Sequence, residues 1–220
     1  DRGATIARPI ALLAVVYPAW LLASLGVVPF GVLPLVATLV VVAVLGWGSL
    51  LRQPTRDLAW VRAFAWTELA ALALFALFVW FRGFTPDILN TEKPMDVALL
   101  ASSARSVVMP PPDPWFAGQP INYYYLGYLL HGSLARLAGV AAPTAFNLAL
   151  ASIFSMTAVA SFGLAWNVVR PWFGRIAATG AGGLALIGVV LAGNLYAPVR
   201  LLQDPQAVWN AWWWDSDGIG

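Results

Sequence analysis

Long runs of apolar residues dominate this chain and predict helices that cross a membrane. About 20 apolar residues of helix span a hydrocarbon core about 30 Å thick. No charged side chain occurs between residues 9 and 51, and Pro29 and Gly31 divide this run because neither favours a helix interior. A weaker run further along contains His131. The pattern predicts six crossings, at residues 9–28, 32–51, 63–81, 123–140, 144–169 and 176–199.

The predicted fold class is an all-α, polytopic transmembrane helical bundle. A membrane β-barrel would show short segments of alternating hydrophobicity, and none is visible. Glycines in the sixth crossing indicate close approach of helices; they are Gly180, Gly182, Gly183 and Gly188. We expect residues 1–220 to form a single membrane domain that belongs to a longer chain, because Asp1 is not a natural start.

A less apolar loop, residues 82–122, separates the third and fourth predicted crossings. Within it, Thr91 can cap a helix that runs to about Met109, before three consecutive prolines. Apolar residues recur there at helical spacing: Val97, Leu100, Ala101, Ala104, Val107 and Val108. This pattern predicts an amphipathic helix that lies on the membrane surface.

The arginines predict which side of the membrane the loop occupies. Arg and Lys in short loops favour the cytoplasmic side. With Arg2 and Arg8 inside, seven arginines are inner and three are outer. The inner set is Arg2, Arg8, Arg52, Arg56, Arg62, Arg136 and Arg200; the outer set is Arg82, Arg170 and Arg175. Loop 82–122 is then extracytoplasmic.

Composition excludes several classes of protein. Apolar residues make up 60% of the chain and charged residues 10%, whereas soluble domains carry about 25% charge, so a cytosolic enzyme is excluded. The net charge of +2 is too small and scattered for a nucleic-acid-binding face. The absence of Cys and the single His exclude disulfides, a Cys nucleophile and a multi-His metal site.

Acidic residues gather in the loop, where four of the ten occur. If the predicted helix includes Glu92, then Glu92 and Asp96 are i,i+4 neighbours that repel each other. Lys93, Arg105, a metal ion or a cation on another helix would offset this repulsion. A solvated acidic loop with no chemical role is the alternative interpretation.

Aromatic and ionisable groups follow at the entrance of the fourth predicted crossing. Tyr123, Tyr124 and Tyr125 fit either an aromatic belt or a site for a sugar or lipid head group. Consecutive helical residues point about 100° apart, so at most two of the three can face one ligand. His131, deeper in the crossing, is either a helix–helix hydrogen-bond partner or a functional group.

Three ordered segments carry a resemblance to a known family. They are Thr91-Glu92-Lys93-Pro94-Met95-Asp96, the run from Pro111 to Gly118, and Ile121-Asn122-Tyr123-Tyr124-Tyr125-Leu126-Gly127. Together they resemble the "YYY" family of polytopic membrane proteins from bacteria and archaea. That family is in turn similar to lipid-dependent membrane glycosyltransferases of the protein-mannosyltransferase and aminoarabinose-transferase kind. The resemblance implies further helices on both sides of this segment and a place in the bacterial plasma membrane.

The resemblance implies transfer of a sugar from a polyprenyl-phosphate donor at the outer membrane face. In that reaction Asp96 is the first candidate for the catalytic base and Glu92 the second. The expected substrate-binding residues are Asp113, which could alternatively shape the loop, and Asn122, Tyr123, Tyr124, Arg105, Lys93 and His131. A divalent metal is possible but not required. The expected partners are membrane lipids, the polyprenyl-phosphate sugar and the remaining helices, without nucleic acid.

Two functions of other classes remain open. A non-catalytic scaffold, or a subunit of a larger membrane complex, also fits the low charge and the glycine-rich helix face. A transporter would usually show paired broken helices or repeats in two halves, and neither is visible in the sequence. A polar cavity around Glu92 and Asp96 would favour the enzyme.

Overall fold

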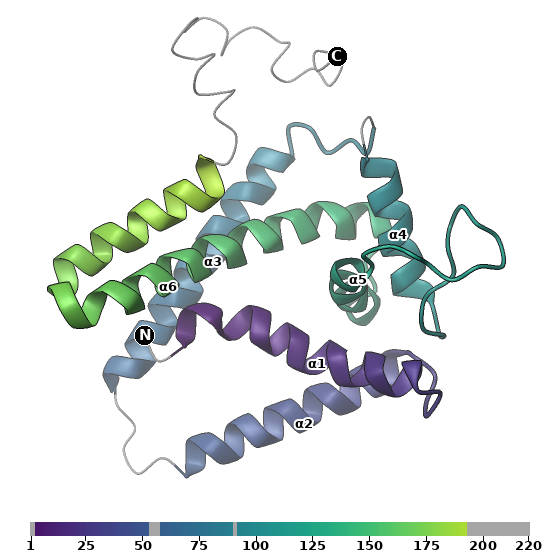
Figure 1. Ribbon diagram of the computed structural model, residues 1–220, viewed down its shortest axis with the longest axis horizontal. Coiled ribbons are helices and arrows are strands. Elements are labelled where there is room, and N and C mark those ends of the chain that lie inside the picture. The colour runs from purple at the N-terminus through teal and green to yellow at the C-terminus, as the bar shows by residue number, and fades with distance from the viewer. Residues whose placement is uncertain (1–2, 53–57, 90–91, 193–220) are drawn as a thin grey trace, which may run out of the picture. The chain divides into compact units, whose positions relative to one another are not determined.

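The computed structural model describes residues 3–52, 58–89 and 92–192, and helices are the regular structure of that part of the chain. The elements, in order, are η1 (Ala4–Ile6), α1 (Ala7–Ser24), α2 (Val32–Leu51), α3 (Leu58–Arg82), α4 (Lys93–Arg105), α5 (Leu126–Ala138), α6 (Ala142–Leu186) and η2 (Ile187–Leu191) (Figure 1). The prediction of an all-α protein is confirmed.

Four segments of the described chain are long and apolar enough to cross a membrane. They are Ala4–Ser24, Val32–Leu51, Trp60–Arg82 and Ala142–Leu191. The last one is 50 residues long. At 1.5 Å per residue, a straight helix of that length would measure about 75 Å, far more than a bilayer requires.

Helix α6 therefore folds back on itself. Gly174 has φ 79° and ψ −175°, a conformation outside the helical region that glycine adopts without a Cβ penalty. The chain reverses there, so α6 consists of two arms (Figure 1). The arms correspond to the predicted crossings 144–169 and 176–199, and residues 193–199 lie outside the described residues.

Helix α5 differs from the crossing predicted at residues 123–140. It begins at Leu126 and has 13 residues, about 20 Å, so it is too short to span the hydrocarbon core. Gly139, with φ 67°, ends it in a left-handed conformation. In Figure 1, α5 is seen nearly end-on while α1 and α2 run across the page, so α5 lies across their direction.

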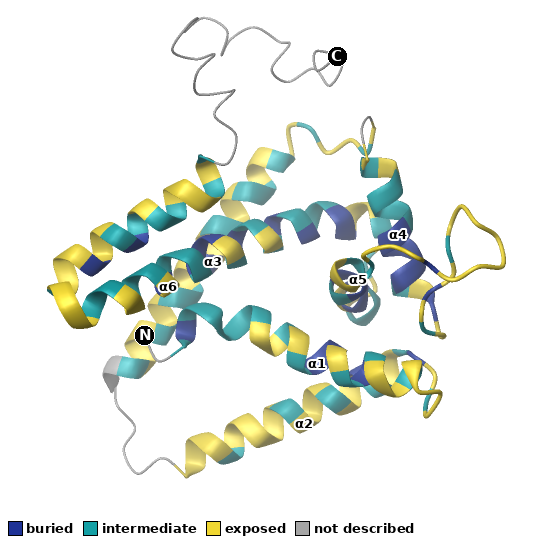
Figure 2. Cartoon of the chain, viewed as in Figure 1, coloured by how far each residue is buried: buried dark blue, intermediate teal, exposed yellow. Residues whose placement is uncertain are grey.

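Helix α4 is shorter than the predicted surface helix and more enclosed. It ends at Arg105, because Ser106 has an extended backbone, and Thr91 lies outside the described residues. Five consecutive residues, Leu99 to Ser103, are buried (Figure 2). At 100° per residue these five point to every side of the helix, so the prediction of a one-sided amphipathic helix is wrong. The predicted pattern included Val107 and Val108, which lie beyond the helix end.

The described chain divides into two compact units. One unit contains Ala7–Arg62 and Glu92–Leu150, and the other contains Asp1–Ile6, Ala63–Thr91 and Ala151–Gly220. We call them the α4–α5 unit and the α6 unit. The core of the α4–α5 unit joins α1, the turn before α2, α2 and α5 through Val16, Ala19, Phe30, Leu35 and Leu129.

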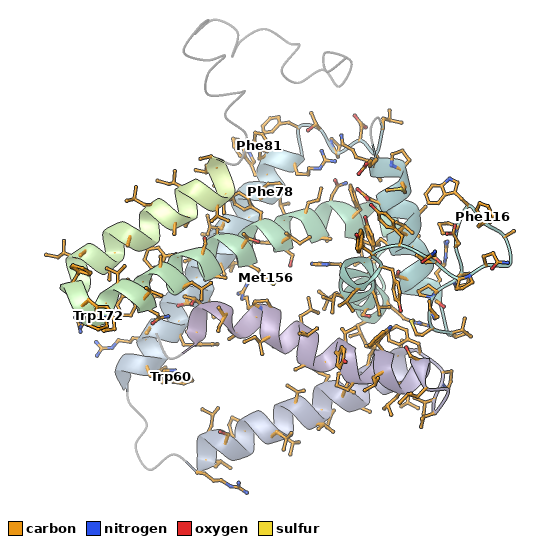
Figure 3. All side chains as sticks on the ribbon, in the orientation of Figure 1. Trp60, Phe78, Phe81, Phe116, Met156 and Trp172 are labelled. Carbon is orange, nitrogen blue, oxygen red and sulfur yellow. The ribbon has the colours of Figure 1, made fainter. Side chains whose placement is uncertain are left out.

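The α6 unit is stabilised by contacts of α3 with the first arm of α6. The Ser155 hydroxyl donates a hydrogen bond to the carbonyl oxygen of Ala71 at 2.6 Å, and both residues are buried. The rings of Phe78 and Phe154 pack with centroids 4.7 Å apart. Figure 3 labels Phe78 on α3 and Met156 on α6. These contacts hold two candidate spans together.

Candidate functional site

Helices α4 and α5 cross at Gly132. A Cβ atom at this position would lie 3.0 Å from the Ala104 nitrogen and 3.2 Å from the Leu100 carbonyl oxygen. The two backbones therefore come within contact distance, and a side chain at residue 132 would separate them. This close crossing sets the positions of the residues one turn earlier on each helix.

One turn before the crossing, a carboxylate of α4 meets a phenol of α5. The Tyr128 hydroxyl donates a hydrogen bond to Oδ1 of Asp96 at 2.5 Å, and both residues are half-buried. Burial raises the pKa of Tyr128, and the hydrogen bond to Asp96 raises it further. The phenol therefore stays protonated and holds the carboxylate in a fixed orientation.

Glu92 and Lys93 lie beside this pair. The carbonyl oxygen of Glu92 accepts a hydrogen bond from the Asp96 N–H at 2.9 Å, which places the two acidic residues one turn apart. The Glu92 side chain is exposed, and its charge adds a small contribution to the raised pKa of Tyr128. Lys93 begins α4 three residues before Asp96, a spacing that makes their side chains neighbours.

Arg105 does not belong to this group. It lies nine residues after Asp96 on the same helix, about 13.5 Å further along the axis and on the opposite face. A role of Arg105 in binding the substrate stays a prediction, and it would act away from Asp96. Lys93 is the basic residue of α4 that shares the neighbourhood of Asp96.

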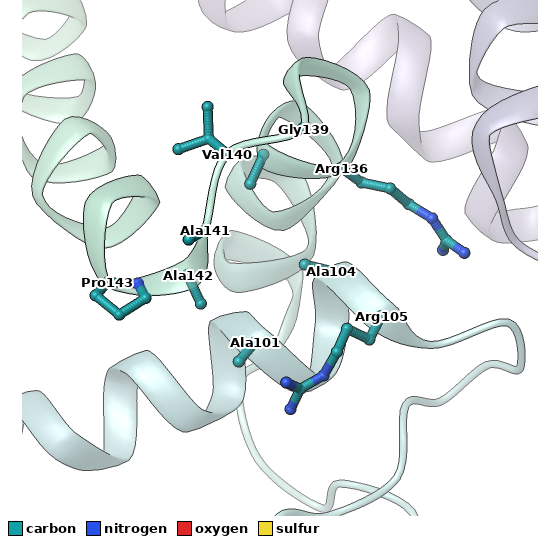
Figure 4. A pocket seen from close by; sticks show the side chains of 10 residues that line it. Ala101, Ala104, Arg105, Arg136, Gly139, Val140, Ala141, Ala142 and Pro143 are labelled. Carbon is teal, nitrogen blue, oxygen red and sulfur yellow. The ribbon is translucent and has the colours of Figure 1, made fainter.

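Arg105 instead borders an open pocket at the other end of α4 (Figure 4). The pocket has a volume of about 670 Å³ and is lined by Ala101, Ala104, Arg105, Ala135, Arg136, Gly139, Val140, Ala141, Ala142 and Pro143. Small apolar side chains form most of its wall. Figure 4 shows the Arg136 side chain extending away from Pro143 and the pocket wall around it.

Arg136 has a structural role in the α4–α5 unit. Its guanidinium donates a hydrogen bond to the carbonyl oxygen of Ser106 at 2.6 Å and lies 6.0 Å from the ring centroid of Phe30. Ser106 belongs to loop 82–122, so Arg136 is in direct contact with this loop. The prediction that placed Arg136 on the inner side and the loop on the outer side is inconsistent with this bond.

Asp113 shapes its loop. Its Oδ1 accepts hydrogen bonds from the backbone N–H groups of Trp115 at 2.8 Å and Phe116 at 2.9 Å. The Asp113 N–H donates to the carbonyl oxygen of Gln119 at 2.8 Å and closes the loop. The two bonds from Trp115 and Phe116 use one of the two carboxylate oxygens of Asp113. That Asp113 also binds a substrate hydroxyl stays a prediction.

Residues 121–125, before α5, lie outside regular secondary structure. Asn122, Tyr123 and Tyr124 are exposed, and the rings of the two tyrosines meet edge to face with centroids 5.2 Å apart. Tyr125 turns the other way and accepts a hydrogen bond from Trp20 Nε1 at 2.8 Å. Two of the three tyrosines are therefore accessible to a ligand.

His131 is buried and makes no hydrogen bond to Asp96. Its Nδ1 lies 3.1 Å from the Gly127 carbonyl oxygen, which can only accept, so Nδ1 carries the proton in this contact. Nε2 is buried and, in the described part of the chain, has no hydrogen-bond partner; the same is true of Ser103 Oγ. The sequence places His131 deep in a membrane crossing. Because α5 lies across the direction of α1 and α2, the position of His131 along α5 does not indicate how deep it lies in the membrane.

Tyr128 and Gly132 are the site residues that the sequence did not identify. The partner of Tyr128 lies 32 residues away, and no local spacing relates them. No group of three or more His, Asp or Glu residues able to hold a metal ion occurs within residues 3–52, 58–89 and 92–192. We therefore assign no residues to the possible divalent metal.

Four long apolar spans define an integral, multi-pass membrane protein. Residues 14–218 match the family described as "Uncharacterized membrane protein (DUF2298)", and the chain belongs to this family. No curated protein and no solved structure matches the chain. The match agrees with the polytopic membrane family expected from the sequence. The description of the family does not assign an activity to it.

Proposed function

We propose that the full-length protein transfers a sugar from a polyprenyl-phosphate donor to an acceptor, with Asp96 as the general base. The observation that carries this proposal is the 2.5 Å hydrogen bond from Tyr128 to the half-buried Asp96 carboxylate. A catalytic carboxylate needs a fixed orientation, and this bond provides it. Lys93, one turn away, supplies positive charge near the same carboxylate.

The reaction requires one proton acceptor and stabilisation of one leaving group. The acceptor hydroxyl or amide attacks the anomeric carbon and loses its proton to Asp96. The bond between that carbon and the phosphate oxygen breaks, and polyprenyl phosphate leaves with the electron pair. Positive charge near the phosphate stabilises the departing anion, and Lys93 is the candidate for this role.

The location of α4 supports a lipid-linked donor. The Phe30 N–H donates a hydrogen bond to the Val107 carbonyl oxygen at 2.8 Å, which ties the segment after α4 to the turn between α1 and α2. These helices are candidate spans, so their turn marks one surface of the hydrocarbon core. A donor whose tail stays in the bilayer presents its sugar in this layer.

Replacing Tyr128 with phenylalanine tests the proposal without removing the carboxylate. The change deletes the hydrogen bond that orients Asp96, and we expect the transfer rate to fall about tenfold, which corresponds to about 1.4 kcal/mol. The measurement is transfer of labelled sugar from polyprenyl phosphate by the purified full-length protein. Tyr17→Phe, which removes a hydroxyl from α1, is the matched control and should leave the rate unchanged. Equal rates for both variants would contradict the role of Tyr128.

In the same proposal, each arm of α6 crosses the membrane separately and α5 lies in the membrane plane. The segment then has five crossings instead of the predicted six. The turn at Gly174 lies on the inner side, together with Arg170 and Arg175. Arg170 and Arg175 then count as inner and Arg136 and Arg200 as outer, so the balance stays at seven inner and three outer arginines and fits the preference of arginine for the cytoplasmic side equally well.

A cysteine at Trp172 distinguishes the two topologies. Trp172 is 82% exposed and adjacent to the α6 turn, and the chain has no native Cys in these 220 residues. With five crossings, an impermeant thiol reagent should label Trp172→Cys only after the cells are opened. Asp113→Cys, in the outer loop, should be labelled in intact cells and serves as the control. Labelling of both Trp172→Cys and Asp113→Cys in intact cells would support the topology with six crossings.

A further inference from the structure

Residues 113–124, which we call the aromatic loop, display large aromatic side chains to the exterior of the α4–α5 unit. Phe116 is 71% exposed and Tyr124 is 86% exposed, and Trp115 and Tyr123 are also exposed. No charged side chain occurs between residues 114 and 125. Such a concentration of exposed aromatic surface indicates an interaction site.

The aromatic loop holds these side chains in place through its backbone. Asp113 fixes the tip through its two hydrogen bonds to the N–H groups of Trp115 and Phe116. At the base, the N–H of the buried Ile121 donates to the carbonyl oxygen of Pro111 at 2.8 Å. The loop therefore presents its aromatic tip as a defined surface, and the tip does not fold back onto the protein.

The position of the aromatic loop points to one partner. The bond from the Phe30 N–H to the Val107 carbonyl oxygen connects the segment that leads into it to the turn between the candidate spans α1 and α2, and the bond from Arg136 to the Ser106 carbonyl oxygen connects the same segment to α5. The α1–α2 turn itself exposes Leu25 and Val27. In Figure 1 the turn and the loop lie at the same end of this unit, and Figure 3 shows Phe116 at its outer edge.

We propose that the aromatic loop inserts Trp115 and Phe116 into the head-group region of the bilayer and anchors α4 and α5 at the membrane surface. Trp and Tyr concentrate at this interface because their rings are apolar at one end and polar at the other. The absence of charge between residues 114 and 124 removes the main cost of inserting the tip into that layer. The anchor is independent of the proposed sugar transfer, because it concerns only where α4 and α5 are held.

Spin labels in the full-length protein test this anchor. Any cysteine outside these 220 residues is first replaced, and Phe116→Cys is then labelled with a nitroxide in bilayer nanodiscs. We expect collisions with oxygen, which partitions into the bilayer, to exceed those with a water-soluble nickel chelate. Asp87→Cys, an exposed acidic position in loop 82–122, is the aqueous control and should show the opposite preference.

Two outcomes would overturn the anchor. Nickel collisions at residue 116 equal to those at residue 87 would place the tip in water. Low collision rates with both reagents would show that another part of the chain covers the tip. Trp115→Cys, labelled in the same way, provides a second measurement if Phe116→Cys does not fold.

Discussion

Replacement of Asp96 by asparagine is expected to reduce sugar transfer by the full-length protein by about 10²–10⁴-fold, the usual contribution of a general base. Asparagine has the same shape and can still accept the hydrogen bond from Tyr128, but it cannot take up the proton of the acceptor. Because the contact with α5 is kept, the amount of folded protein should change little. The measurement is the rate of transfer from labelled polyprenyl-phosphate sugar at equal protein concentration.

Glu92→Gln is the companion variant, since the two carboxylates lie one turn apart and could share the role. Asp87→Asn removes an exposed carboxylate from the same loop and should leave transfer unchanged. If Asp96 is only a surface charge, Asp96→Asn should alter stability by no more than about 0.5 kcal/mol and leave activity intact. Near-normal transfer by Asp96→Asn, Glu92→Gln and the double variant would favour a non-catalytic scaffold.

The spans could be predicted from the sequence because burial in lipid requires a simple property, a run of about 20 apolar residues. The same criterion failed for α5. Residues 123–140 are apolar enough on average, but Tyr123 and Tyr124 lie outside the helix and Gly139 ends it. Apolar composition does not distinguish a helix that crosses the bilayer from a short one that packs against α1 and α4.

The candidate site was only partly predictable. The ordered signature around Glu92, Asp96 and the tyrosines predicts that these segments form the site, but the contact of Asp96 with Tyr128 depends on how two helices cross. The separation of Arg105 from Asp96 could have been predicted, because nine residues of helix always place side chains on opposite faces. The structural role of Arg136 could not, since its partners Ser106 and Phe30 are distant in the chain.

Gly132→Val is expected to destabilise the protein by about 1–3 kcal/mol, the usual cost of overpacking. The Cβ alone would lie 3.0 Å from the Ala104 nitrogen and 3.2 Å from the Leu100 carbonyl oxygen, and valine adds two methyl groups. These neighbours are backbone atoms of a buried helix, so they cannot move as a flexible side chain would. The measurement is the thermal unfolding temperature of the full-length protein in detergent.

Gly127→Val is the matched control, because residue 127 lies on the same helix and a Cβ there meets no atom within 4 Å. It should change stability by no more than about 0.5 kcal/mol. Gly132→Val should also lower sugar transfer in the fraction that stays folded, since separating α4 from α5 lengthens the bond between Tyr128 and Asp96. A Gly132→Val protein as stable and active as Gly127→Val would show that the helices do not need this close crossing, and that the orientation of Asp96 does not depend on it.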